Sequence, residues 1–226
     1  MKKSITLVPV LFLMAFSMQA WAWHDETHLA IAKAAGYEKW YNATGADMVK
    51  LKAGNIENRN HHVNNKPGTI VTPRMVLSQV RLYNRSGALN GHLYGAILGA
   101  IREYRTTTRQ DKYAEYHLAF CAHYVGDLSQ PLHNTLYNDY NKRNHVATDA
   151  VINGEVLYKL PLIEVYPIVI QSEDDLAQEV ARIANLSLNL GYQLEKEGRM
   201  ISRQEAYVQI GHSASLFRGI LRWLGK

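Results

Sequence analysis

The stretch His117-Leu-Ala-Phe-Cys-Ala-His123-Tyr-Val-Gly-Asp127-Leu-Ser-Gln-Pro-Leu-His133 decides how this chain folds around its polar residues. Its first part has an apolar helical pattern, and Gln130-Pro131 predicts a turn because proline does not continue a helix easily. His123 and Asp127 are four residues apart, so a helix places them on one face. The turn at Gln130-Pro131 could bring His133 back towards that face.

The same spacing recurs further along the chain, where His145 and Asp149 predict a second helix face with an imidazole and a carboxylate. A histidine and a carboxylate on one face can share a metal ion. One such pair is common by chance on a solvated helix. Two pairs together with His133, all within residues 123–149, favour shared metal binding instead.

The composition narrows the ligand chemistry to imidazole and carboxylate. The chain of 226 residues has ten histidines and one cysteine. A single cysteine cannot form an internal disulfide, a cysteine-rich zinc finger or an iron–sulfur cluster. We expect Cys121, on its apolar stretch, to be a buried free thiol. With 47% hydrophobic and 20% charged residues, the chain is predicted to be globular and not disordered.

The first residues are predicted to be a signal peptide that is not part of the fold. Met1-Lys2-Lys3 is basic, Ile5 to Phe16 is mostly apolar, and Ala20-Trp21-Ala22 forms a small-residue cleavage site. The apolar stretch is short for a membrane span of ~20 residues. We therefore expect residues 1–22 to be removed, leaving residues 23–226 as a single periplasmic or secreted domain. The formal charge then falls from +5 because two lysines leave, and the remaining basicity is weak evidence for an anionic partner.

The rest of the chain predicts an all-α fold in one compact multi-helix bundle. Thr72-Pro73 is typical of a helix start, residues 54–68 and 126–131 are expected to be a loop and a turn, and residues 157–170 have no clear assignment. Apolar periodicity predicts helices over Glu26 to Lys39, Asp47 to Ala53, Met75 to Tyr83, Gly91 to Tyr104, Asp111 to Val125, His145 to Val151, Glu173 to Glu197 and Arg203 to Trp223.

His-x-x-x-Asp, then Gln-Pro-Leu-His, then His-x-x-x-Asp resembles the zinc-dependent phospholipase C family and the related single-strand-specific zinc nucleases. The resemblance covers roughly Trp23 to Asp149. It implies an all-α domain that holds three zinc ions at the bottom of a cleft. In both groups the mature chain begins with a tryptophan whose backbone amine and carbonyl bind zinc, and the predicted cleavage exposes Trp23.

The resemblance implies a ligand set distributed over the three ions. One ion would be held by Trp23, His28 and Asp127, and the second by Asp47, His61, His123 and the bridging Asp127. The third would be held by His133, His145 and Asp149, which leave coordination positions open, as a catalytic zinc requires.

Some of these ligand assignments have an alternative interpretation. Asp47 could be an ordinary acid at a helix N-terminus, and His62 competes with His61, which we favour as the ligand. Asn64 stands where the lipases have aspartate. His24 is expected to be a neighbour of the site, and His92, His117 and His212 are expected to be surface or core histidines.

The resemblance also implies a mechanism, hydrolysis of a phosphodiester by a zinc-activated water, with Asp47 and Asp127 as catalytic residues. Asp47 could hold the proton of the nucleophile. Lys50, one turn later, could add charge near the transition state or could be a solvated lysine. Tyr137 and Tyr140 could contact the substrate by stacking on a base or beside a headgroup cation, or could be plain loop packing.

The features disagree on the substrate. The short Trp23–His28 spacing and Asp149 are similar to the nucleases, whereas the short His133–His145 connection and the absence of cysteine pairs are similar to the lipases. We expect a phospholipase C-like enzyme, with a single-strand-specific nuclease releasing 5'-nucleotides or a zinc-binding protein without turnover as alternatives. The partner is then a phospholipid headgroup or single-stranded nucleic acid, with contact to a membrane surface possible and no obligate protein partner indicated.

Overall fold

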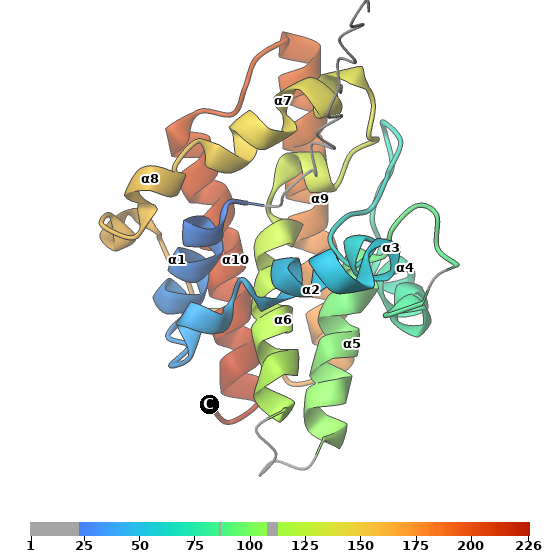
Figure 1. The fold of residues 1–226 in the computed structure, drawn as a ribbon, viewed down its shortest axis with the longest axis vertical. Coiled ribbons are helices and arrows are strands. Elements are labelled where there is room, and N and C mark those ends of the chain that lie inside the picture. The colour runs from blue at the N-terminus through green and yellow to red at the C-terminus, as the bar shows by residue number, and fades with distance from the viewer. Residues whose placement is uncertain (1–22, 86, 108–112) are drawn as a thin grey trace, which may run out of the picture.

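A central helix, α6 (Ala114–Leu128), organises the molecule. In the computed structural model, which describes residues 23–85, 87–107 and 113–226, α6 contacts α1 (Asp25–Ala35), α2 (Gly45–Ala53), α5 (Leu93–Thr106), α9 (Glu173–Glu197) and α10 (Arg203–Trp223). Figure 1 shows α5, α6, α9 and α10 running roughly along the long axis, with α2 crossing in front of α6. Because α6 is covered on nearly all sides, its polar residues His123 and Asp127 are buried.

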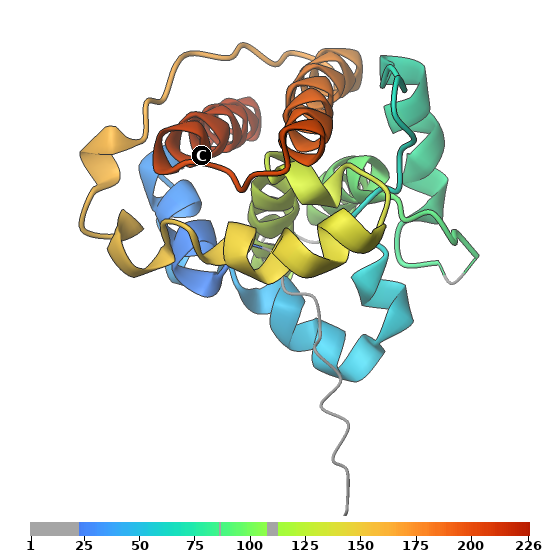
Figure 2. The ribbon, with the colours of Figure 1, turned by 90° about the horizontal axis from the view of Figure 1, so that it is seen from above.

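Shorter elements close the upper end of the bundle. Seen from above, α7 (Asp139–Ala150) lies across this end (Figure 2). Helices α2 and α3 (Asn55–Asn58) lie on the side away from α9 and α10. No β-strand occurs among the described residues, which contain only one isolated bridge, between Asn65 and Thr135. The remaining α-helices are α4 (Pro73–Gln79) and α8 (Asn153–Val156). The 3-10 turns are η1 (Trp40–Asn42), η2 (Val80–Leu82), η3 (Pro131–His133) and η4 (Leu160–Leu162).

The all-α prediction is confirmed, and the two C-terminal helices have the predicted bounds. Both begin with a capping box. The Ser172 hydroxyl accepts a hydrogen bond from the Asp175 backbone N–H, and the Asp175 carboxylate accepts one from the Ser172 backbone N–H. Ser202 and Glu205 repeat the arrangement. Thr72 caps α4 before Pro73, as its sequence predicts.

Several predicted boundaries are wrong for local reasons. The first helix ends at Ala35, four residues early, because Gly36 adopts a left-handed conformation with φ of 90°. The predicted loop 54–68 contains the single turn α3, and α6 continues through Gly126 to Leu128 instead of turning at 126. The helix predicted from His145 starts at Asp139, where the Asn138 side chain caps it.

The core consists of a large apolar cluster around α5, α6 and α9 and a smaller one that contains Trp23, Ile152 and residues of α10. Cys121 is buried and forms no disulfide, as predicted. Among the described helices, none combines the length and the apolar character that crossing a membrane needs. The predicted signal peptide, residues 1–22, lies outside the described residues.

Gly95 offers a test of the α4–α5 contact. A Cβ atom at this position would lie 2.3 Å from the backbone carbonyl carbon of Gln79. We expect Gly95→Ala to destabilise the fold by ~1–3 kcal/mol, because the backbones must separate, despite the better helix propensity of alanine.

Denaturant unfolding followed by circular dichroism measures this effect. Gly154→Ala in α8 is the matched control, because a Cβ there has no atom within 4 Å, and it should be neutral or slightly stabilising. Equal unfolding midpoints for Gly95→Ala and the wild type would show that α4 does not pack closely against α5 at this position.

Candidate metal centre

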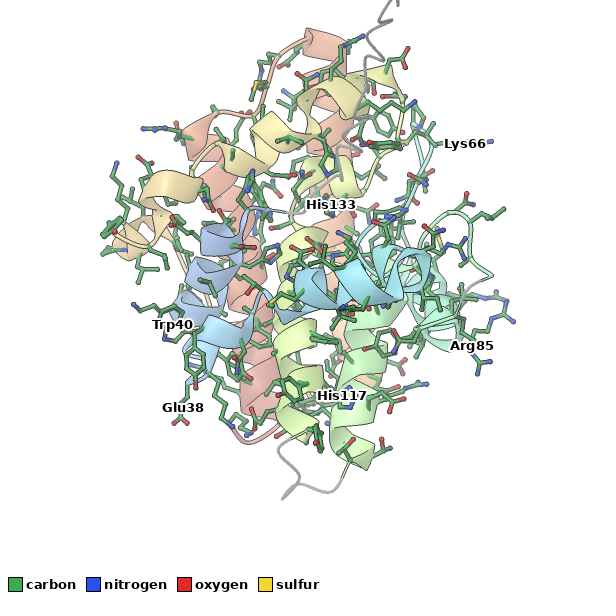
Figure 3. The ribbon with its side chains drawn as sticks, viewed as in Figure 1. Glu38, Trp40, Lys66, Arg85, His117 and His133 are labelled. Atoms are coloured by element: carbon green, nitrogen blue, oxygen red, sulfur yellow. The ribbon has the colours of Figure 1, made fainter. Side chains whose placement is uncertain are left out.

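Buried histidines and carboxylates from six segments converge at the upper end of α6. Figure 3 shows His133 at this end of the bundle and His117 near the opposite end. The contributing residues are His28 on α1, Asp47 on α2, His61 after α3, His123 and Asp127 on α6, His133 on η3, and His145 and Asp149 on α7.

These side chains form three buried groups, and each could hold a metal ion. Within a group, the ligand atoms all lie within 4.8 Å of one another. His123 belongs to two groups, so the first two sites adjoin. The groups are His28 with His123 and Asp127, Asp47 with His61 and His123, and His133 with His145 and Asp149.

Asp127 is the contact point of the cluster. Its Oδ2 lies 2.9 Å from His61 Nδ1 and 3.5 Å from His123 Nε2. Its Oδ1 lies 3.4 Å from His28 Nε2 and 3.6 Å from His133 Nδ1. One fully buried carboxylate therefore faces histidines from four separate elements.

Gly126 allows α1 to approach this carboxylate. A Cβ at position 126 would lie 2.4 Å from Nδ1 of His28. With glycine there, the His28 ring instead stacks on His123 with centroids 3.7 Å apart. The dipeptide Gly126-Asp127 thus supplies both the space for His28 and its carboxylate partner.

Three of the histidines have one ring nitrogen anchored to an oxygen acceptor. Nδ1 of His123 lies 2.8 Å from the Ala43 carbonyl oxygen, and Nδ1 of His145 lies 2.7 Å from Asn141 Oδ1. Nδ1 of His133 lies 2.5 Å from the His61 carbonyl oxygen. These acceptors assign the proton to Nδ1 and leave the Nε2 lone pair directed into the site, which is the arrangement that supports a metal-binding histidine.

His61 is anchored in the opposite sense, by Glu57. Its Nε2 lies 3.2 Å from Glu57 Oε1, and its Nδ1 faces Asp127 and Asp47, 2.9 Å from Asp127 Oδ2. Glu57 is itself buried and accepts hydrogen bonds from the Tyr124 hydroxyl at 2.6 Å and from Asn60 at 3.0 Å. The carboxylate of Glu57 thereby helps to position His61, and with a cation between Nδ1 and Asp127 it would accept a hydrogen bond from the Nε2 proton and set the tautomer.

Gln130 connects η3 to α7. Its side-chain oxygen accepts hydrogen bonds from the backbone N–H groups of Leu132 and His133, and its amide donates to Oδ1 of Asp149. Asn141 adds a second link by donating to the Leu132 carbonyl at 2.7 Å. These bonds bring His133 and His145 together, with 3.1 Å between their Nε2 atoms.

The polar atoms of the cluster fit a bound cation. Ligand atoms that are buried without a hydrogen-bond partner include His28 Nε2, His123 Nε2, Asp127 Oδ1 and Asp149 Oδ2. A buried polar atom left unpaired costs ~1–3 kcal/mol, and a cation would satisfy several of them together. Nitrogen and oxygen donors in groups of three suit zinc and other first-row metals with a coordination position left open.

The carboxyl groups of the site differ in acidity. Although burial by itself raises the pKa of Asp127, His123 and His133 hold it well below its usual range. Burial raises the pKa of Asp149 well above its usual range, and the hydrogen bond from Gln130 only partly opposes this. The Asp149 carboxyl therefore keeps its proton to a higher pH than an ordinary aspartate.

A cavity of about 410 Å³ adjoins the second and third groups and is lined by His61, His133 and His145. Lys50 lines it too, 3.2 Å from Asp47 Oδ1, and the ring of Tyr137 lies at its edge, 50% exposed. Tyr140 lies elsewhere. Its hydroxyl donates to the Arg199 carbonyl, and its ring packs against the smaller core cluster.

Trp23 lies beside the third group. Its side chain is fully buried in the smaller core cluster, and the backbone N–H of the next residue, His24, lies 3.4 Å from the Asp149 carbonyl oxygen. This places the start of the described chain next to α7, whereas the resemblance assigns Trp23 to the ion held with His28 and Asp127, an assignment that stays a prediction.

The histidines set aside in the sequence have other surroundings. His92 Nε2 bonds Asn60 at 2.8 Å, His212 Nδ1 bonds the Tyr166 hydroxyl at 2.6 Å, and His62 lines the cavity without joining a metal group. Sequence reasoning missed Glu57, although Glu57 and His61 have the same four-residue spacing as the predicted pairs. It also missed Asn141, four residues before His145.

No protein-family model matches the chain, and a search of curated proteins finds no match. The site therefore has to be interpreted from its own geometry.

Glu57 provides a test of the anchoring arrangement. We expect Glu57→Ala to weaken zinc binding ~10–100-fold, because His61 loses the acceptor that fixes its tautomer. Glu57→Gln should lose less, since its amide oxygen can still accept from Nε2. Competition with a chromogenic chelator measures the affinity. Glu38→Ala, at an exposed position, is the control, and equal affinities for all four proteins would contradict this role.

Asp149 provides a test by proton release. Because its pKa is raised, its protonated form competes with a metal, so zinc affinity should fall as pH falls and binding should release a proton. Titration calorimetry in two buffers of different ionisation enthalpy measures the release. We expect Asp149→Asn to release fewer protons than the wild type, whereas Asp174→Asn, exposed on α9, should match it. Identical release from Asp149→Asn would refute the assignment.

Proposed function

We propose that this protein is a zinc-dependent phosphoric diester hydrolase, of phospholipase C type. The observation that carries the proposal is the set of anchored histidines, each presenting one ring nitrogen to the buried carboxylates Asp47, Asp127 or Asp149 below an open cavity. A structural metal site is usually closed, whereas this cluster adjoins a space large enough for a substrate headgroup.

The residues that would hold zinc are those of the three buried groups, completed by the backbone of Trp23 once residues 1–22 are removed. When bound, zinc supplies an ionised water near neutral pH and positive charge for the phosphate oxygens. Asp127 would hold the first two groups in register, because it contacts His28, His61 and His123.

Asp47 and Lys50 complete the proposed catalytic surface. The neighbouring His123, His61 and Lys50 outweigh the effect of burial and lower the pKa of Asp47 to about 2. An ionised Asp47 can accept a hydrogen bond from the attacking water and orient it. Lys50, which reaches both Asp47 and the cavity, would neutralise a phosphate oxygen.

The phospholipase C reading rests on the short connection between His133 and His145, which leaves no room for a long nucleotide-binding loop. A single-strand-specific nuclease is the second candidate, because Tyr137 is half exposed at the cavity and an aromatic ring there could stack on a base. In either case, the proposed signal peptide directs the enzyme to the periplasm or the exterior.

Hydrolysis of an aryl phosphodiester by zinc-loaded protein tests the proposal. We expect Asp127→Asn to reduce the rate by more than the ~100-fold typical of losing a supporting partner, because a neutral amide replaces the shared carboxylate. Chelation should abolish the activity and added zinc should restore it. Asp174→Asn is the control.

A side-by-side assay on phosphatidylcholine, single-stranded DNA and RNA separates the two candidate substrates. Full zinc occupancy without turnover on any diester would contradict the enzyme proposal and indicate a zinc-binding protein without catalytic activity.

A further inference from the structure

The segment that forms one side of the cavity is strongly basic. Residues 40–101 contain seven basic residues and only two acidic ones, Asp47 and Glu57. Both acids are buried at the metal centre, where Asp47 pairs with Lys50, so they offset little of the surface charge of the segment. The other 18 acidic residues of the chain lie outside this segment. The seven cations are Lys50, Lys52, Arg59, Lys66, Arg74, Arg81 and Arg85.

The same segment exposes large aliphatic side chains. On α2 and α3, Met48, Leu51 and Ile56 are 68%, 61% and 40% exposed. Two more aliphatic residues follow in the loops, with Ile70 at 74% and Leu89 at 83% exposure. Single exposed apolar residues are ordinary, but a group of them within a basic surface marks an interaction site.

Met48, Leu51, Ile56 and Leu89 lie next to residues that line the cavity. Lys50, Gly54 and Asn55, which line the cavity, alternate along the chain with Met48, Leu51 and Ile56. Asn64 also lines the cavity, and its backbone N–H bonds the carbonyl of Asn90, next to Leu89, at 2.8 Å. Figure 2 shows α2 and α3 forming one outer edge of the bundle, remote from α9 and α10. In Figure 3, Lys66 and Arg85 lie on the side of the molecule towards α3 and α4.

We propose that this basic and apolar face, residues 48–56 with the loop around Leu89, docks onto an anionic lipid bilayer. The inference rests on the proposed function and names where that function operates. Docking would place the cavity against the headgroups, so that a phosphodiester reaches the metal centre without leaving the membrane. Lysines attract the anionic surface, and exposed aliphatic side chains insert at the boundary between headgroups and acyl chains.

Single-stranded nucleic acid is the competing partner for a basic face, but it fits this one less well. Bases stack on aromatic rings, whereas the exposed apolar residues of α2 and α3 are aliphatic. Aliphatic side chains gain nothing from a phosphate backbone, and they gain free energy when they leave water for a lipid interface.

The test uses the zinc-loaded mature chain and sedimentation with two kinds of vesicle, phosphatidylglycerol mixed with phosphatidylcholine, and phosphatidylcholine alone. We expect binding to the anionic vesicles that weakens with added salt. Met48→Ser combined with Leu51→Ser, and Lys52→Glu combined with Lys66→Glu, should each weaken binding by about tenfold or more.

Matched controls come from the opposite part of the molecule. Val169→Ser combined with Val208→Ser removes aliphatic residues of 75% and 53% exposure, and Lys196→Glu reverses an exposed charge on α9. Both should bind vesicles as the wild type does. All variants should hydrolyse a soluble aryl phosphodiester at the wild-type rate.

Each outcome separates the two proposals. Failure of the wild type to bind anionic vesicles, or undiminished binding by the α2 serine variant, overturns the docking proposal. Binding of single-stranded DNA that is lost in the lysine variant, without vesicle binding, reassigns the face to nucleic acid. Failure to hydrolyse the soluble diester refutes the enzyme, while vesicle binding still reports on the face.

Discussion

The structure depends on one buried carboxylate, Asp127, held in the interior by histidines from α1, η3, the segment after α3 and its own helix. Burying a charge is costly unless it is paired and hydrogen bonded. His28 and His61 come from segments far from Asp127 in the sequence, so their contacts with Asp127 fix how these segments meet α6. Satisfying this charge therefore determines the geometry at the upper end of the bundle.

The second constraint comes from the groups that form hydrogen bonds with the candidate ligands. Each anchored ring is held by a different acceptor, a backbone carbonyl for His123 and His133, an amide for His145 and a carboxylate for His61. Because these acceptors belong to the helices and turns themselves, correct folding orients each ring before a metal arrives. Preorganisation of this kind reduces the reorganisation that binding would otherwise require.

Much of the fold and of the cluster could be predicted from local pattern. Apolar periodicity and serine caps define α9 and α10, and the four-residue spacing finds the residues of α6 and α7 because both members of a pair share one helix. Glu57 was missed because its turn is only four residues long, too short for periodicity to identify. Its hydrogen bond with Tyr124 joins positions 67 residues apart, which no local pattern contains.

The difference in charge between residues 40–101 and the rest of the surface follows from where the acidic residues lie. Residues 40–101 carry two carboxylates, and the metal centre takes both into the interior. Apart from Lys50, which pairs with Asp47, most cations of that segment therefore keep their charge at the surface. Elsewhere the acids remain outside and pair with neighbouring cations, as Glu155 does with Lys159 and Arg203, and Glu205 with Arg199. Building the buried site thus produces the positive potential around its own opening, which suits an enzyme whose substrate carries a phosphate.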